Sequence, residues 1–116
     1  KGRLFEDAVS NAFYPVDLHN KSGVKPKPLK PGTVPTIPLS ALIPKKSRNI
    51  LVAGRCVSSD RLANSGLRVQ ASCMGMGQAA GLAASLAVAQ KTTPLEVPLE
   101  EIHRELKRHG AIVPGK

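Results

Sequence analysis

The stretch from Asn49 to Gly81 restricts the possible folds of this chain more than any other part. It reads NILVAGRCVSSDRLANSGLRVQASCMGMGQAAG, which is a short apolar run, a glycine, a polar loop and a segment dominated by Gly and Ala. The run Ile50–Ala53 is apolar without alternation, as in a strand covered on both faces of a parallel sheet. Gly54 then allows a turn that a side chain would hinder. We therefore expect a buried strand that leads into a helix.

This helix should begin near Ser65, a favourable N-cap residue, and end near Gln90, because Pro94 prevents its continuation. Only three residues between positions 71 and 89 are polar, namely Ser72, Gln78 and Ser85. A helix that is apolar nearly all round should be buried. One stripe of it carries only small residues, namely Gly77, Ala80, Gly81 and Ala84. The stripe fits either close packing against a sheet or, near its N-terminal end, space for a flat cofactor.

The preceding residues predict shorter elements. Lys1–Ala12 has apolar residues at helical spacing, and Tyr14–Leu18 alternates weakly, so we expect a packing helix followed by an edge strand. Lys21–Pro35 contains four prolines and four lysines and should be an extended surface loop. Ile37–Ile43 lies among prolines and is typical of a strand near a sheet edge, followed by a turn over residues 45–48.

The C-terminal residues carry the signals of one more helix. Pro98 suits its first turn, acidic residues follow at 100 and 101, basic residues stand at 107–109, and Gly110 lies past the end. Leu99, Ile102 and Leu106 share the face that would be buried. We expect this helix to pack against the core and to carry no chemistry.

The net charge of +9, from 17 Lys and Arg against 8 Asp and Glu, invites a nucleic-acid interpretation. The basic residues are spread along the chain, however, and no aromatic residue is interleaved with them for base stacking. We therefore expect no nucleic-acid partner.

Cys56 and Cys73 form no CxxC pair, so we expect no metal site, although a link between the two cysteines stays open. The sequence assigns no cellular compartment.

Residues 71–89 are about as long as a bilayer span and contain the Gly77-x-x-x-Gly81 spacing known from membrane helix pairs. The stretch is mostly Ala, Gly and Ser, with few residues that drive insertion, so we expect no membrane partner.

Only three aromatic residues are available to anchor a core, namely Phe5, Phe13 and Tyr14. On its own, this 116-residue chain should self-associate through the surface of residues 71–89 or be only marginally stable.

Several strings in the chain resemble one known family. VAGRC at 52–56, SxxRV at 65–69 and CMxMGQAAG at 73–81 closely resemble the C-terminal signature of bacterial FAD-dependent oxidoreductases of the large two-domain flavoprotein type. YPVDLHN at 14–20 and IPLSALIPK at 37–45 resemble the family's preceding segments in the same order. Gly66 and Gly75 stand where alanine is commoner. The family's FAD-binding fingerprint GxGxxG is missing from these residues, so we expect a fragment of a larger protein.

The resemblance implies an α/β fold, as the C-terminal fragment of a Rossmann-like FAD-binding domain with a long buried helix, a few strands and a C-terminal helix. Residues 1–48 would be part of a substrate or cap region that includes the Pro/Lys-rich loop. Residues 49–116 would be the C-terminal strand and helices of the FAD-binding domain. The partners would be FAD, an unknown small-molecule substrate and the rest of that domain.

The resemblance also implies that the start of the long helix faces the pyrimidine edge of the isoalloxazine ring. There the partial positive charge of the helix and the guanidinium of Arg68 would favour the negative charge of the reduced flavin. Gly54 and Arg55 would border the ribityl and phosphate portion, with a salt bridge to Asp60 as the structural alternative for Arg55. The candidate cofactor-binding residues are Gly54, Arg55, Ser65, Gly66, Arg68 and Val69.

His19 is the catalytic candidate. Together with Asp17 it lies at the end of an expected strand, where residues near the flavin can meet substrate and handle a proton. The alternative is a histidine that only hydrogen-bonds a loop carbonyl.

Two other function classes stay open from the sequence. Some proteins that resemble this chain carry polysaccharide-lyase labels, and a basic loop would suit an acidic polymer, although no sufficient Tyr/His/Arg constellation for β-elimination is visible. The Pro/Lys-rich loop could instead belong to a non-catalytic interaction module. A flavin spectrum would favour the oxidoreductase over both.

Overall fold

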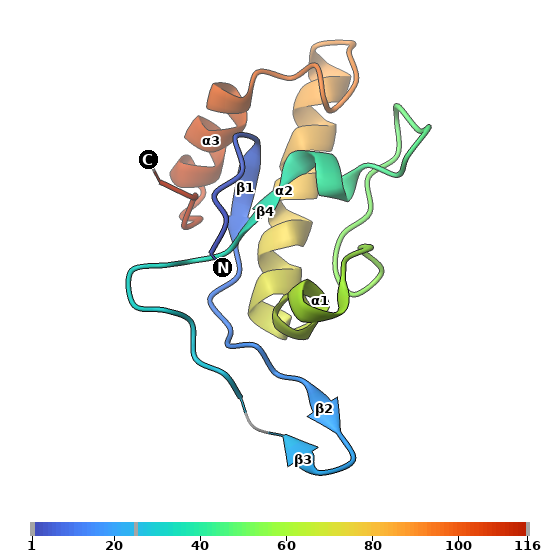
Figure 1. The fold of residues 1–116 in the computed structure, drawn as a ribbon. Coiled ribbons are helices and arrows are strands. Elements are labelled where there is room, and N and C mark those ends of the chain that lie inside the picture. Colours follow the sequence, from blue (N-terminus) through green and yellow to red (C-terminus); the bar gives the residue numbers. More distant parts are fainter. Residues whose placement is uncertain (1, 25, 116) are drawn as a thin grey trace.

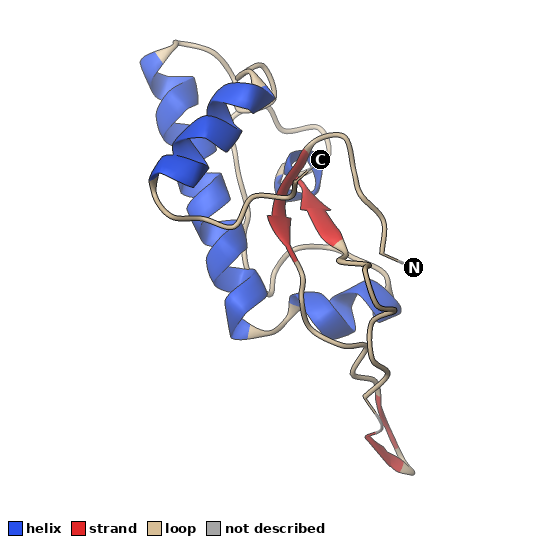
Figure 2. Cartoon of the chain, turned by 90° about the vertical axis from the view of Figure 1, so that its left-hand side faces the viewer, coloured by secondary structure: helices blue, strands red, loops and turns tan. Residues whose placement is uncertain are grey.

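The computed structural model of the chain describes residues 2–24 and 26–115. Its elements in order are β1 (Ala8–Asn11), β2 (His19–Asn20), β3 (Gly23–Val24), β4 (Thr36–Pro38), the 3₁₀ helix η1 (Leu39–Leu42), α1 (Arg61–Leu67), α2 (Gln70–Ala89) and α3 (Leu99–Arg108). The strands form two separate antiparallel pairs, β1 with β4 and β2 with β3. The β2–β3 pair projects from the body as a narrow arm (Figures 1 and 2), which explains the elongated extents of 51 × 29 × 20 Å.

The core lies along one side of α2. Met76, Ala79 and Ala83 of this helix are fully buried. β1, η1 and α3 all pack on α2 (Figure 1), and the buried side chains that they and β4 contribute include Val9, Ile37, Leu42, Ile102 and Leu106. Alanines at the contact positions allow a strand and a helix to approach α2 closely, because little side chain stands between the backbones.

The expectation that the long helix is buried nearly all round is wrong for the described residues. Met74 and Val88 of α2 are 74% and 79% exposed, and a Cβ added at Gly77 or Gly81 would meet open space. By length and composition α2 could cross a membrane, and 33% of an 18-residue stretch of this helix is buried in the fold. The helix therefore has a packed side and an open apolar side.

The single helix from Ser65 to Gln90 is also a wrong prediction, because the chain forms two helices. Val69 has extended backbone angles (φ −77°, ψ 154°) and separates α1 from α2. The N-cap of α1 is Asp60, whose carboxylate accepts a hydrogen bond of 2.8 Å from the Ala63 amide. Ser65 lies inside α1 and is buried. Asp60 and Ser65 are both favourable N-cap residues; Asp60 starts the helix, and the Ser65 hydroxyl instead accepts from Asp17 N.

Two predictions before α1 fail for a common reason. Residues of the expected helix Lys1–Ala12 form strand β1, because its backbone pairs with β4, with an irregularity between Ala8 and Ser10. Ile50–Ala53 forms no strand in the described structure; Val52 donates one hydrogen bond of 2.7 Å to Leu42 O, and Ile50 is exposed. Strand formation depends on a neighbouring strand, which β4 provides for β1.

The remaining predictions are met in part. Within Ile37–Ile43 the strand β4 ends at Pro38 and η1 follows. Around Tyr14–Leu18 only an isolated bridge between Val16 and Lys27 forms before β2. The Pro/Lys-rich segment contains β3, and its Lys25 lies outside the described residues. The C-terminal helix is confirmed as α3, with Ile102 and Leu106 buried.

The architecture is thus a mixed arrangement of helices and small antiparallel sheets, compatible with the α/β class. β1 and β4, from residues 1–48, pack together and β1 lies on α2 from residues 49–116 (Figure 2). The division at residue 48 stays a prediction.

Candidate functional site

The N-terminus of α2 is an open donor site. Its first backbone hydrogen bond runs from Cys73 N to Val69 O at 3.0 Å, so the amides of residues 70–72 have no acceptor within the helix. Among the described residues no side chain caps this end, and none in its first turn is acidic. Gln70 and Ala71 are exposed. We call this end the α2 tip; it carries the partial positive charge of a helix that is 20 residues long.

Arg68 directly precedes the α2 tip. Its Nη2 atom donates to the main-chain oxygen of Asp17 at 3.1 Å and to Asp17 Oδ2 at 3.4 Å. The arginine side chain is 39% exposed. The contact with Asp17 therefore restrains a guanidinium beside the open amides while leaving part of it accessible.

Asp17 connects Arg68 with His19. His19 Nε2 lies 3.4 Å from Asp17 Oδ2, the same oxygen that Arg68 contacts. Asp17 Oδ1 is buried and has no hydrogen-bond partner in the described part of the chain. His19 itself is exposed. The arrangement orients an accessible imidazole by a carboxylate, as a proton-handling residue requires.

Ser65 and Gly66 of α1 hold the segment that carries Asp17. The Ser65 hydroxyl donates to Leu62 O at 2.7 Å and accepts from Asp17 N at 3.2 Å. A Cβ added at Gly66 would lie 3.4 Å from Tyr14 O, so the absence of a side chain there lets α1 approach the backbone of this segment. Both residues therefore hold the segment of Asp17 against α1.

The turn at Gly54 is joined to the same site. Gly54 has φ +88°, a conformation that favours glycine. Arg55 Nε donates to Arg68 O at 3.0 Å, whereas Asp60, its alternative partner, caps α1. Five of the candidate residues thus lie around the α1–α2 junction, namely Arg55, Ser65, Gly66, Arg68 and Val69. Hydrogen bonds of Ser65 and Arg68 with Asp17 bring His19 close to this junction.

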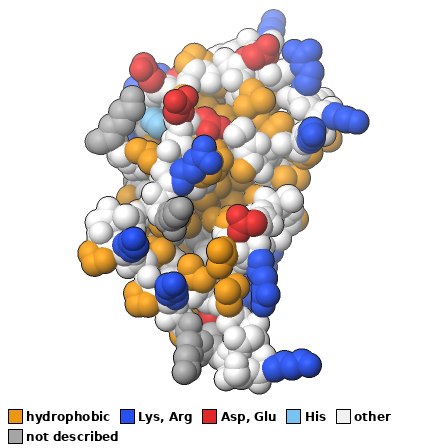
Figure 3. All heavy atoms as spheres, viewed as in Figure 1, with side chains coloured by type: hydrophobic (Ala, Val, Ile, Leu, Met, Phe, Trp, Pro, Cys, Tyr) orange, Lys and Arg blue, Asp and Glu red, His pale blue; other side chains and the backbone are white. Residues whose placement is uncertain are grey.

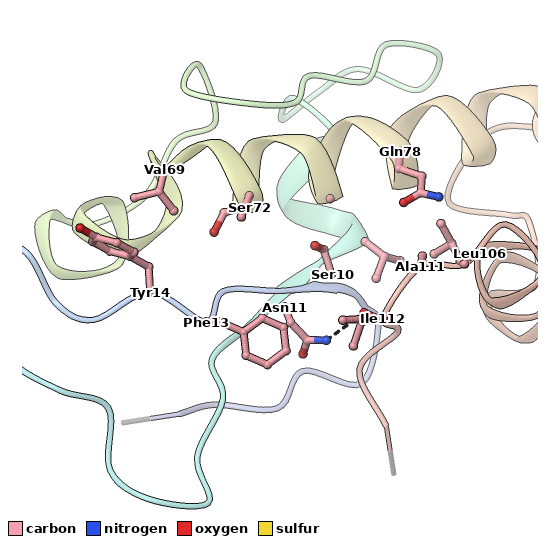
Figure 4. Close-up of a pocket in the computed structure, with 14 residues that line it drawn as sticks. Ser10, Asn11, Phe13, Tyr14, Val69, Ser72, Gln78, Leu106, Ala111 and Ile112 are labelled. Carbon is pink, nitrogen blue, oxygen red and sulfur yellow. Dashed lines mark hydrogen bonds between the residues drawn. The ribbon is translucent and has the colours of Figure 1, made fainter.

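A groove beside the α2 tip was missed from the sequence. Its volume is about 380 Å³, and it is lined by β1, the N-terminal half of α2, the aromatic residues Phe13 and Tyr14, and the segment after α3 (Figure 4). Some of these parts are more than 100 positions apart in the sequence, so no local pattern could reveal the groove. The only local signal was the position of Phe13 and Tyr14, two of the three aromatic residues.

Within residues 2–24 and 26–115 no group of three or more His, Cys, Asp or Glu residues could hold a metal ion. Cys56 and Cys73 are both free thiols.

Comparison with known proteins gives one match. The family model described as FAD dependent oxidoreductase matches residues 1–106 of the 116-residue chain. No curated protein and no solved structure matches the chain. The match supports neither the polysaccharide-lyase interpretation nor the interaction module. It covers β1, the junction between α1 and α2, and most of α3, which include all the residues described around the α2 tip. The chain therefore belongs to the FAD-dependent oxidoreductase family, whose members are flavoproteins with FAD as the cofactor.

Proposed function

We propose that this chain forms the flavin-contacting part of an FAD-dependent oxidoreductase, in which the α2 tip and Arg68 face the pyrimidine edge of the isoalloxazine ring. The observation that carries the proposal is the uncapped and exposed start of α2 with a restrained guanidinium next to it. When bound, FAD supplies a two-electron acceptor for a hydride.

The donor set of the α2 tip fits this edge of the ring. The edge is rich in hydrogen-bond acceptors and gains negative charge on reduction, so it needs donors and positive charge. The amides of residues 70–72 supply donors, and the Arg68 guanidinium supplies donors and a full positive charge. The contact with Asp17 fixes the guanidinium before any ligand binds. Val69 sets the direction of the tip, because its extended conformation starts α2.

The other candidate residues have supporting roles in this proposal. Gly54 and Arg55 border the ribityl and phosphate portion. Arg55 Nε donates to Arg68 O, and within the described residues the terminal nitrogens of its guanidinium make no hydrogen bond, so they are available to a phosphate. Ser65 and Gly66 contribute by holding the Asp17 segment against α1. We assign proton handling at the substrate to His19 Nδ1, because Asp17 contacts the other ring nitrogen, Nε2, and orients the imidazole through it.

The pyrophosphate of FAD needs a further site. The GxGxxG fingerprint that binds it is absent from residues 1–116. In this proposal the fingerprint and the parallel strands of a Rossmann-like domain come from a larger protein of which this chain is the C-terminal part.

The test is flavin binding by the full-length protein and its dependence on Arg68. The purified protein should show a flavin absorption spectrum with one FAD per chain. Arg68→Met should lower the two-electron reduction potential of the bound flavin by about 30 mV or more, because a charge-assisted contact worth about 1.5 kcal/mol is lost from the reduced state. Arg104→Met is the matched control, since Arg104 lies on α3 and is 68% exposed. Equal potentials in the Arg68 and Arg104 variants would refute the assignment of Arg68.

A further inference from the structure

The groove beside the α2 tip has the size and position of a small-molecule site. Its volume of about 380 Å³ lies in the range of ligand pockets. Val69, Ala71 and Ser72 line one end of it, so the groove begins at the α2 tip. Figure 4 shows Ser72 and Gln78 pointing from α2 toward β1, and Ser10 pointing back from β1. A ligand in this groove would lie next to whatever the tip binds.

The groove is electrically neutral although the chain has a net charge of +9. Of the described residues that line it, none is Lys, Arg, Asp, Glu or His. Beyond the α2 tip, which the flavin occupies in the proposed function, a charged ligand would lose hydration without gaining a charged side chain of opposite sign from the described lining. The lining therefore favours an uncharged ligand.

Two aromatic rings stand at the groove. Phe13 and Tyr14 are 57% and 40% exposed, so both rings are accessible to a ligand in the groove. The faces of aromatic rings carry partial negative charge and attract the slightly positive C–H bonds of a saturated ring. These residues favour a ring compound over an open chain.

The polar groups of the groove offer both acceptors and donors of hydrogen bonds. Asn11 uses its amide nitrogen to donate to Ile112 O at 2.9 Å, and the Gln78 amide nitrogen points to His109 O at 3.5 Å. The Ser72 hydroxyl donates to Gly66 O at 3.2 Å. Each amide nitrogen keeps a second N–H, the two amide oxygens accept, and the hydroxyls of Ser10 and Tyr14 can do either. The complementary ligand therefore both donates and accepts hydrogen bonds, as a hydroxyl group does.

We propose that the groove binds an uncharged ring compound that carries several hydroxyl groups, such as a neutral pyranose. Its C–H face lies against Phe13 and Tyr14, and its hydroxyls donate to the amide oxygens of Asn11 and Gln78. That this compound is the substrate of the enzyme rests on the proposed function, because only a flavin at the α2 tip makes the neighbouring groove a reaction site. The binding itself requires no flavin.

The test is saturation-transfer NMR on the purified full-length protein at about 0.15 M salt, where surface charge is screened. The probes are methyl glucopyranoside and methyl glucuronide, which differ by one carboxylate. We expect saturation to be strongest on the ring C–H protons, and the glucuronide to bind at least about tenfold more weakly than the glucoside. Phe13→Ala and Tyr14→Ala should each weaken glucoside binding about fivefold.

Leu62→Ala is the matched control, because Leu62 lies on α1 outside the groove lining and is 59% exposed, as Phe13 is. It should leave binding unchanged, and thermal unfolding should show all three variants folded. Equal binding of the two probes, or unchanged binding in both aromatic variants, overturns the proposal. A purified protein without flavin would refute the proposed function but leave this binding measurement intact, so the two failures are distinguishable.

Discussion

Arg68 Nη2 lies 3.1 Å from the main-chain oxygen of Asp17 and 3.4 Å from its carboxylate, across 51 positions of sequence. The pair joins the α1–α2 junction to the segment that leads into β2. Arg68→Lys keeps the positive charge but loses the guanidinium nitrogen Nη2, which contacts both oxygens, so it should lower the free energy of unfolding by about 1 kcal/mol. Urea denaturation measures this, with Arg104→Lys on the exposed side of α3 as the control. Equal losses in the two variants would contradict the structural importance of the pair.

Ser65 should matter although it is not an N-cap. Its buried hydroxyl is the acceptor for Asp17 N and the donor to Leu62 O. Ser65→Ala leaves the Asp17 amide without its partner and should cost about 1–2 kcal/mol of unfolding free energy. Ser85→Ala on the exposed side of α2 is the comparison and should be neutral or slightly stabilising. A neutral Ser65→Ala in thermal and urea unfolding would rule out this role.

Gly75 and Ser10 should be energetically coupled. A Cβ at Gly75 would clash with Ser10 Oγ, so Gly75→Ala gains about 1 kcal/mol of helix propensity only if the hydroxyl moves away. Combining Gly75→Ala with Ser10→Ala removes the clash, and the double-mutant cycle should show a favourable coupling of about 0.5 kcal/mol or more. Gly81→Ala meets open space and should show no coupling to Ser10→Ala. Additive effects at Gly75 and Ser10 would mean that the two do not touch.

The loop between α2 and α3 should respond to acid through Glu96. Hydrogen bonds from the Thr93 side chain, the Thr92 side chain and the Thr93 amide lower the pKa of Glu96 from 4.5 to about 2, and Arg48 adds to this. Because the pKa is depressed in the folded state, the stabilisation is present above pH 4.5 and is lost as the pH falls through about 2.

Glu96→Gln should therefore flatten the dependence of stability on pH between 4.5 and 2. Thermal unfolding over this pH range measures the change. Glu6→Gln, at an exposed position in a turn, should leave the slope as in the parent chain. An unchanged slope in Glu96→Gln would show that the threonine contacts do not persist in solution.

The open apolar side of α2 should make the 116-residue chain self-associate. Met74 and Val88 are its most exposed large residues. Sedimentation velocity should show oligomers that increase with concentration, and Met74→Glu with Val88→Glu should shift the chain toward monomer, because a charge on the contact face costs desolvation. A compact monomer of the parent chain at all concentrations would refute the expectation.

Around the α2 tip the residues singled out from the sequence lie close together, but the sequence did not predict their contacts. Arg55, Ser65 and Arg68 meet at the junction, and His19 approaches through Asp17. The reason for Ser65 was wrong, because it binds Asp17 N instead of capping a helix. The groove was missed because Asn11, Gln78 and Ile112 come together only when β1 and the end of the chain pack on α2.

The sequence by itself determined α3, the apolar content of α2, the positive-φ turn at Gly54 and the family motifs, because capping, composition and motif spacing act within a few residues. Only the tertiary structure decided that residues 8–11 form a strand, that Val69 divides the helix and that α2 keeps one side open. Strand pairing, the choice between two N-caps and the covering of a helix face depend on partners tens of positions away, and their energies outweigh the weak local preferences of Ala, Gly and Ser.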